Sequence, residues 1–175
     1  MIGNFFIYLR RFILLLLLQV LVCNHIHIMG YATPLVYIYF LLLFPSGISR
    51  WTLLIWGFIM GLLVDTFANT PGMAASCMTL TAMIQPTLLK MFGPREEENE
   101  DLKPSVKTMG WGPFSRYVTL ASLIYTILFF TLESFSFFNW IDLLLNIGGS
   151  LILTVLMIIA FESVRNSSQK KTKTT

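Results

Sequence analysis

Residues 51–72, WTLLIWGFIMGLLVDTFANTPG, combine an apolar run of lipid-crossing length with a single carboxylate. Within this run Gly57, Gly61 and Asp65 follow one another at intervals of four residues, so they share one face of a predicted helix. The pair Pro71–Gly72 ends the run and predicts a turn. Because a carboxylate inside the hydrocarbon of a bilayer is costly, we expect Asp65 to face protein or water and to have a defined task.

The composition of the whole chain is that of an integral membrane protein. Of its 175 residues, 55% are hydrophobic and 12% are charged, and the mean hydropathy is +0.72. A soluble domain of this size would need a more charged surface. Apolar runs of about twenty residues, which match a hydrocarbon core of about 30 Å, recur along the chain. We therefore predict an all-α, polytopic bundle of six transmembrane helices, at residues 5–23, 33–49, 51–68, 72–92, 115–134 and 139–162.

The distribution of cations predicts how these helices are oriented. The twelve Lys and Arg residues fall at the N-terminus, after the second or fourth predicted helix, or at the C-terminus. By the positive-inside rule, both termini and the loop 93–114 are then cytoplasmic. We expect residues 1–165 to form a single transmembrane domain and residues 166–175 a basic, disordered cytoplasmic tail.

The predicted helix 33–49 is the weakest of the six. Pro34 and Pro45 bracket its short apolar core, and proline interrupts helical hydrogen bonding. We expect this segment to be tilted, kinked or partly re-entrant.

The position of Asp65 limits its task. It lies fifteen residues after Arg50, which is roughly 22 Å along a helix and therefore in the outer third of the membrane. Three interpretations are open: Asp65 caps the helix end before residues 69–72, it pairs with polar groups of neighbouring helices, or it relays protons or binds a substrate cation. The outer position and the absence of bases within the membrane favour the first two.

Two pairs of small residues predict close helix packing, Gly57 with Gly61 and Gly148 with Gly149. Ser150, next to the second pair, would be an intramembrane nucleophile only if a base lay beside it. Nothing in the sequence places either histidine near this serine, so we expect it to serve helix packing.

Other motifs that carry chemistry are missing. Residues 23–29, CNHIHIM, gather soft and imidazole ligands, but a metal site needs three or four converging ligands and no second cluster accompanies them. The sequence has no metalloprotease, phosphate-binding or dinucleotide-binding motif, and its cations flank helices instead of forming a patch with aromatic residues. We therefore predict neither an enzyme nor a cofactor, a metal or a nucleic-acid partner.

The motif Gly57-x-x-x-Gly61-Leu-Leu-x-Asp65, followed by Pro71–Gly72 and the small residues at 74–76, resembles the MreD family of rod-shape-determining membrane proteins. The region 129–142 is similar to that of Bacteroidetes-type members. Length, six helices and cytoplasmic termini agree along essentially the whole chain. The longer acidic loop at residues 95–101 and the weak second helix depart from the family pattern.

The resemblance implies a non-enzymatic scaffold of the cell-elongation machinery in the bacterial inner membrane, acting in peptidoglycan synthesis. Its partners would be the lipid bilayer, MreC, the actin-like MreB, and RodA with its class B penicillin-binding protein. We expect Glu133, Trp140 and Asp142 to shape the outer surface where a periplasmic partner docks. The family fold is similar to that of the six-helix substrate-binding subunits of energy-coupling-factor vitamin transporters, so a vitamin-binding subunit is the alternative function.

Overall fold

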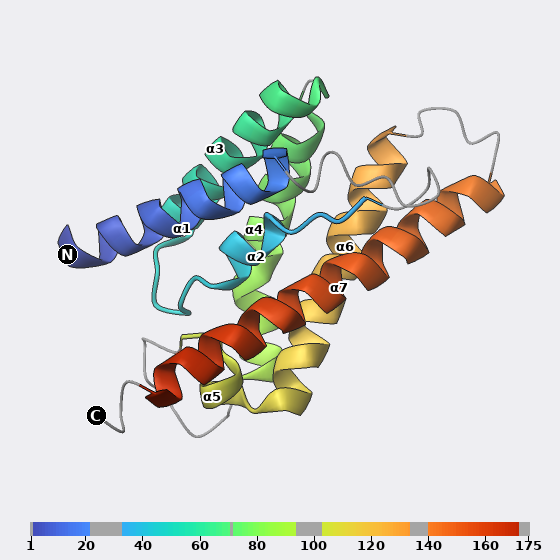
Figure 1. The fold of residues 1–175 in the computed structure, drawn as a ribbon. Helices are drawn as coiled ribbons and strands as arrows, with labels where there is room; N and C mark the ends of the chain where they lie inside the picture. Colours follow the sequence, from blue (N-terminus) through green and yellow to red (C-terminus); the bar gives the residue numbers. More distant parts are fainter. Residues whose placement is uncertain (1, 22–32, 71, 94–102, 134–139, 172–175) are drawn as a thin grey trace.

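The computed structural model describes residues 2–21, 33–70, 72–93, 103–133 and 140–171, and these residues form helices and no strand. The all-α prediction is confirmed. The described residues form five long helices and two short ones, arranged as in Figure 1. The long helices are α1 (Ile2–Leu21), α3 (Arg50–Ala68), α4 (Met73–Phe92), α6 (Trp111–Glu133) and α7 (Trp140–Lys171), and the short ones are α2 (Ile38–Leu42) and α5 (Val106–Met109).

The surface of the bundle is apolar and its interior holds polar side chains. Large apolar side chains of α3 and α7 are exposed, among them Trp51, Phe58, Ile141 and Ile152. Several polar side chains are buried inside instead: Gln19, Asp65, Thr81, Gln85, Ser122, Thr126, Ser150, Thr154 and Glu162. This distribution suits a lipid environment, in which apolar surface needs no cover and polar groups must find partners within the protein.

Among the described residues, three helices are long and apolar enough to cross a membrane, Arg50–Ala68, Trp111–Glu133 and Ile141–Asn166. Together with the apolar surface they identify a membrane protein.

The long helices pack in sequence order. Helix α3 packs on α4, α4 packs on α6, and α6 packs on α7, while α1 lies against α3 and the α2 segment. The α3–α4 turn, the end of α6 and the start of α7 lie at one end of the molecule in Figure 1. The start of α3, the end of α4, α5, the start of α6 and the end of α7 lie at the other.

The prediction of a lipid-length helix over residues 33–49 is wrong. Only Ile38–Leu42 is helical, and the segment around it is buried among the other helices. Prolines at 34 and 45 account for the interruption, because each removes a backbone donor. Aromatic contacts hold the segment antiparallel to α1: Tyr8 stacks on Phe44 with ring centroids 4.8 Å apart, and Phe12 meets Phe40 edge-on at 5.3 Å.

The other predicted helix boundaries differ from the observed helix boundaries mainly in the C-terminal half of the chain. Helix α6 starts at Trp111, and α5 forms before it, so the end of the predicted loop 93–114 is helical. Helix α7 continues to Lys171, which lies within the predicted tail 166–175.

Candidate functional site

The junction between α3 and α4 is organised by one carboxylate. Asp65, in the last turns of α3, is 4% exposed. Its Oδ1 accepts hydrogen bonds from the backbone N–H of Ala74 and the hydroxyl of Thr70, both at 2.8 Å. Its Oδ2 accepts one from the backbone N–H of Ala75 at 2.9 Å. The side chain of one helix therefore caps the N-terminus of the next, whose first N–H groups have no partner within their own helix.

The backbone between the two helices reverses through left-handed residues. Asn69 ends α3 at φ 57°, and Gly72 precedes α4 at φ 79°. A left-handed conformation is readily adopted by glycine and tolerated by asparagine. The predicted turn residue Pro71 lies between them, outside the described residues.

The close approach of α3 to α4 brings the Asp65 carboxylate within hydrogen-bonding distance of the α4 backbone. A Cβ atom added to Gly61 would lie 2.5 Å from the carbonyl oxygen of Ala74 and 2.5 Å from the Cα atom of Ala75. Side-chain atoms do not approach backbone atoms this closely. At Gly57 the added atom would lie 3.3 Å from the Cβ of Ala82 and the carbonyl oxygen of Met78. Both predicted packing glycines therefore face α4, and Gly61 is at the tightest point.

This geometry combines two of the three interpretations of Asp65. It caps a helix, although the helix is α4 and not the end of α3, and it links two helices by doing so. The carboxylate also lies at the positive end of the α4 dipole, which is a favourable position for an acceptor. Both oxygens are already occupied by donors that the fold holds in place, which is the arrangement of a structural group.

A second polar network supports the broken segment around α2. At its start, the Gln19 side chain of α1 donates to the carbonyl of Pro34 at 3.1 Å and accepts from the N–H of Val36 at 3.0 Å. Thr154 of α7 accepts from the N–H of Leu35 at 2.9 Å. These neutral side chains supply the partners that a continuous helix would have supplied itself.

Ser150 belongs to the same network. Its hydroxyl is buried and accepts the N–H of Thr33 at 3.0 Å. The serine that could have been a nucleophile is thus a hydrogen-bond acceptor for backbone.

The other end of the segment is held from α4 and α6. The amide of Gln85 donates to the carbonyl of Phe44 at 3.3 Å and to the hydroxyl of Tyr117 at 2.9 Å. Tyr117 in turn donates to the carbonyl of Leu42 at 3.4 Å. Four helices therefore contribute side chains to one irregular stretch of backbone.

Sequence reasoning missed Gln19, Gln85 and Thr154. A signal was present for two of them, because Gln19 and Thr154 are lone polar residues inside apolar runs, and such residues commonly form hydrogen bonds between membrane helices. Their partners are backbone groups far away in the sequence, so spacing along the chain could not identify them.

The remaining predicted residues belong to α6 and α7. Within the described part of the chain, nothing comes within 4 Å of a Cβ added to Gly148, so close packing does not explain this glycine. Gly149 is half-buried in the same turn of α7. Glu133 is the exposed last residue of α6, Trp140 is the first residue of α7, and Asp142 is half-buried in the first turn of α7.

A cavity of about 450 Å³ opens near Glu133. It lies at the same end of the bundle as the α3–α4 turn. Its walls come from α1, the start of the broken segment, α3 and α6, and its polar lining consists of Gln19, Thr33, Tyr37, Thr70 and Glu133. Such a volume is within the range of small-molecule sites.

The described residues contain no group of three His, Cys, Asp or Glu side chains that could hold a metal ion. The stretch 23–29, with its two histidines, lies outside the described residues. No family model, curated protein or solved structure matches this chain.

Proposed function

We propose that this protein is a non-enzymatic scaffold of the bacterial inner membrane, of the MreD type, that helps organise the cell-elongation machinery. One observation carries the proposal. In the described residues of the motif on which the resemblance depends, Gly57 and Gly61 pack against α4, and Asp65 accepts hydrogen bonds from the backbone of α4 and from the hydroxyl of Thr70. A motif of this kind fixes the relative position of two helices, as a scaffold requires.

The proposed topology has six crossings, with residues 33–49 as a broken crossing inside the bundle and both termini in the cytoplasm. Support comes from the cations Arg50, Lys90, Arg116 and Arg165, which belong to helix ends at the same end of the molecule. By the positive-inside rule this end would face the cytoplasm. The α3–α4 turn, the end of α6 and the start of α7 would then face the periplasm.

The proposed partners are other membrane and periplasmic proteins of cell elongation. Exposed apolar faces of α1, α3 and α7 are available to lipid and to partner helices. Glu133, Trp140 and Asp142 belong to the proposed periplasmic end, where MreC would dock. MreB, RodA and the class B penicillin-binding protein would join the same complex.

Depletion of the protein in its native cell tests the proposal. Cells should swell into spheres, and the protein should co-purify with MreC. Re-expression of the wild-type chain should restore the rod. Unchanged shape together with vitamin auxotrophy would contradict the scaffold function.

The alternative function, a vitamin-binding subunit of an energy-coupling-factor transporter, is favoured by the cavity of about 450 Å³ beside Glu133. A protein of that kind should retain a vitamin-sized ligand on purification and should associate with a coupling subunit and ATPases. Mass spectrometry of the purified protein distinguishes the two functions, because the scaffold should carry no such ligand.

A further inference from the structure

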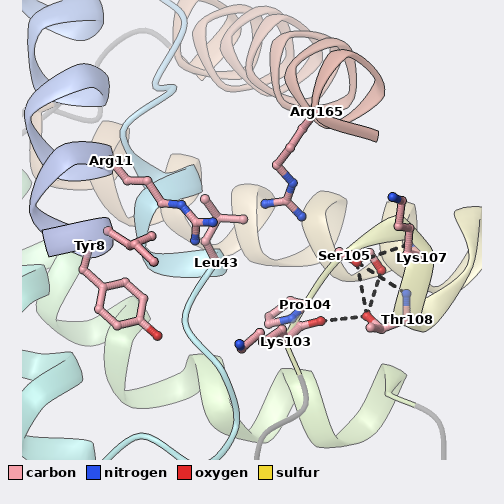
Figure 2. Close-up of a pocket in the computed structure, with 10 residues that line it drawn as sticks. Tyr8, Arg11, Leu43, Lys103, Pro104, Ser105, Lys107, Thr108 and Arg165 are labelled. Atoms are coloured by element: carbon pink, nitrogen blue, oxygen red, sulfur yellow. Dashed lines mark hydrogen bonds between the residues drawn. The ribbon is translucent and has the colours of Figure 1, made fainter. Parts of the chain in front are cut away.

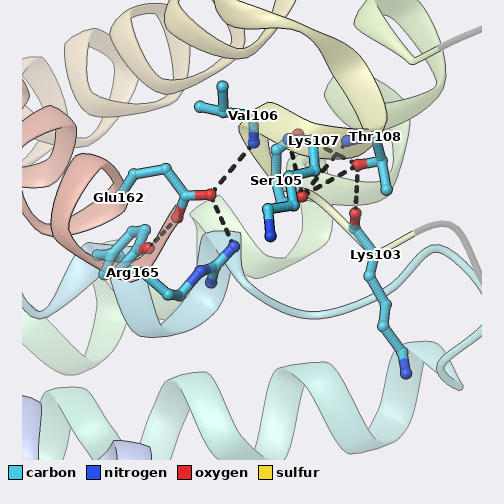
Figure 3. A network of polar contacts seen from close by, with 8 residues as sticks. Lys103, Ser105, Val106, Lys107, Thr108, Glu162 and Arg165 are labelled. Atoms are coloured by element: carbon cyan, nitrogen blue, oxygen red, sulfur yellow. Dashed lines mark hydrogen bonds and ion pairs between the residues drawn. The ribbon is translucent and has the colours of Figure 1, made fainter. Parts of the chain in front are cut away.

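A second buried carboxylate, at the end of the bundle opposite the α3–α4 turn, joins three separate parts of the chain. Glu162 of α7 is 1% exposed. Its Oε1 accepts hydrogen bonds from Arg165 at 2.7 Å and from the backbone N–H of Val106 at 3.1 Å, and its Oε2 accepts one from the hydroxyl of Tyr39 at 2.5 Å. In Figure 3 the carboxylate points towards Val106 and Arg165. One side chain of α7 therefore holds both the turn that contains α5 and the broken segment around α2.

Residues 103–109, which we call the strap, lie at this end of the bundle and include α5. Val106 and Met109 bury their side chains in the core, and α5 contacts α6 and α7. The strap also has internal hydrogen bonds, among them one from the hydroxyl of Thr108 to the carbonyl of Lys103 at 2.7 Å. The strap is therefore a compact turn that can dock on the bundle as a unit.

The strap is packed against the bundle on one side and borders a cavity on another. This cavity has a volume of about 320 Å³ and lies between the strap, α1, α7 and Leu43 of the broken segment. Figure 2 shows Pro104 of the strap across this space from Tyr8 of α1. The strap therefore rests on α6 and α7, and the hydrogen bond from Val106 to Glu162 fastens it on that packed side.

The strap and the broken segment share the two oxygens of one carboxylate. These oxygens are fixed relative to each other, so a movement of Glu162 that breaks the bond at one oxygen also displaces the other. Tyr39 belongs to α2, which has five residues. A helix of this length is not stable by itself and depends on its surroundings. Loss of the support at Tyr39 should therefore loosen α2, and two sites that share a group in this way influence each other reciprocally.

We propose that Glu162 is a latch that couples docking of the strap to the order of the broken segment. Displacement of the strap at Val106 loosens the segment around Tyr39, and loosening of the segment weakens the docking of the strap. The strap is thereby the part of this surface through which a conformational change reaches the interior of the bundle. The inference does not depend on the cell-elongation function.

Amide hydrogen exchange of the full chain in detergent tests the coupling from both sides of the latch. Val106→Pro removes the backbone donor to Oε1. Proline suits this position, because it is accepted at the first residue of a helix and because the preceding Ser105 is extended, at φ −160° and ψ 161°. The Leu43 amide, which bonds to the carbonyl of Tyr39, should exchange about fivefold faster in this variant, at the low end of the coupling between linked sites. Conversely, Tyr39→Phe removes the donor to Oε2 and should accelerate exchange of the Val106 amide by about the same factor.

Tyr117→Phe is the matched control. It also removes a buried tyrosine hydroxyl that donates to the broken segment, at the carbonyl of Leu42, but the donor to that hydroxyl is Gln85 of α4. Exchange at Val106 should therefore stay at the wild-type rate in this variant.

An unchanged Val106 rate in Tyr39→Phe would overturn the proposal, as would an unchanged Leu43 rate in a folded Val106→Pro protein. Equal acceleration at Val106 in both tyrosine variants would also overturn it, because the whole bundle would then have loosened. If Val106→Pro does not fold, the comparison of the two tyrosine variants decides the question by itself.

Discussion

The α3–α4 junction and the broken segment around α2 meet the same requirement in different ways. Each leaves backbone groups without helical partners inside an apolar bundle, where an unsatisfied group is costly. At the junction one charged side chain from nine and ten residues away satisfies both Ala74 and Ala75. Along the broken segment, neutral side chains as far as 119 residues away each satisfy one or two groups. The hydrogen bonds of the junction therefore come from one nearby side chain, and those of the segment come from several side chains that are distant in the sequence.

This difference predicts that single substitutions will damage the junction more than the segment. At the junction, one glycine or one carboxylate determines the whole contact between α3 and α4. In the broken segment, the loss of one supporting side chain leaves the others in place. Unfolding of the purified protein in detergent provides a common scale.

The largest effect is expected for Gly61→Ala. The added methyl group would meet backbone atoms of α4 at 2.5 Å, and backbone cannot move aside as a flexible side chain can. We expect a loss of about 3 kcal/mol in the free energy of unfolding. Gly57→Ala should cost about 1 kcal/mol, because its neighbours at 3.3 Å need to shift only slightly.

Gly148→Ala is the matched control. The described residues leave open space there, so alanine should stabilise α7 by up to about 1 kcal/mol through its helix propensity. Equal effects of alanine at positions 61 and 148 would contradict the close approach of α3 and α4.

Asp65→Asn should come next, with a loss of about 2 kcal/mol. Asparagine keeps one acceptor oxygen but presents an NH₂ group where a backbone N–H needs an acceptor. Asp65→Ala should cost more, since it leaves the donors of Ala74, Ala75 and Thr70 without this partner. The thermal unfolding temperature should therefore be highest for the wild type, lower for Asp65→Asn and lowest for Asp65→Ala. An Ala variant as stable as wild type would exclude the capping role.

In the broken segment, Gln19→Leu should cost about 1.5 kcal/mol, because Pro34 and Val36 both lose their side-chain partner. Amide hydrogen exchange at Val36 should accelerate in the same variant, and exchange at Ala74 should not. Faster exchange at both sites would mean that the two regions unfold together.

Thr154→Val should have the smallest effect, about 0.6 kcal/mol, the size of an average hydrogen bond between membrane helices. It removes the acceptor of the Leu35 N–H and keeps the side-chain shape. Thr79→Val serves as the control, since within the described residues the Thr79 hydroxyl bonds to its own helix, at the carbonyl of Ala75. Indistinguishable stabilities of these two variants would contradict the contribution of Thr154.

The same contrast explains what could be predicted from the sequence. Gly57, Gly61 and Asp65 are spaced on one helix face and precede a Pro–Gly pair, so local periodicity revealed the junction. Pro34 and Pro45 indicated an interruption in residues 33–49, although the lipid-length helix predicted there does not form. The supports of that segment were beyond prediction, because Gln19 and Thr154 contact it through the three-dimensional packing of α1 and α7. Gly148 shows that local sequence can also predict a contact that does not form. The pair of small residues at 148 and 149 implied close helix packing, but the described residues make no such contact at Gly148.

The central claim is that Asp65 acts by fixing α4 on α3. The direct test is to express Asp65→Asn in cells depleted of the wild-type protein and to measure, in the same cells, the amount of folded protein and the degree of rod-shape recovery. We predict that both fall together, so that raising expression until folded protein reaches the wild-type amount restores the rod. Wild-type amounts of folded Asp65→Asn protein in cells that stay spherical would contradict the claim and assign the carboxylate a direct functional role.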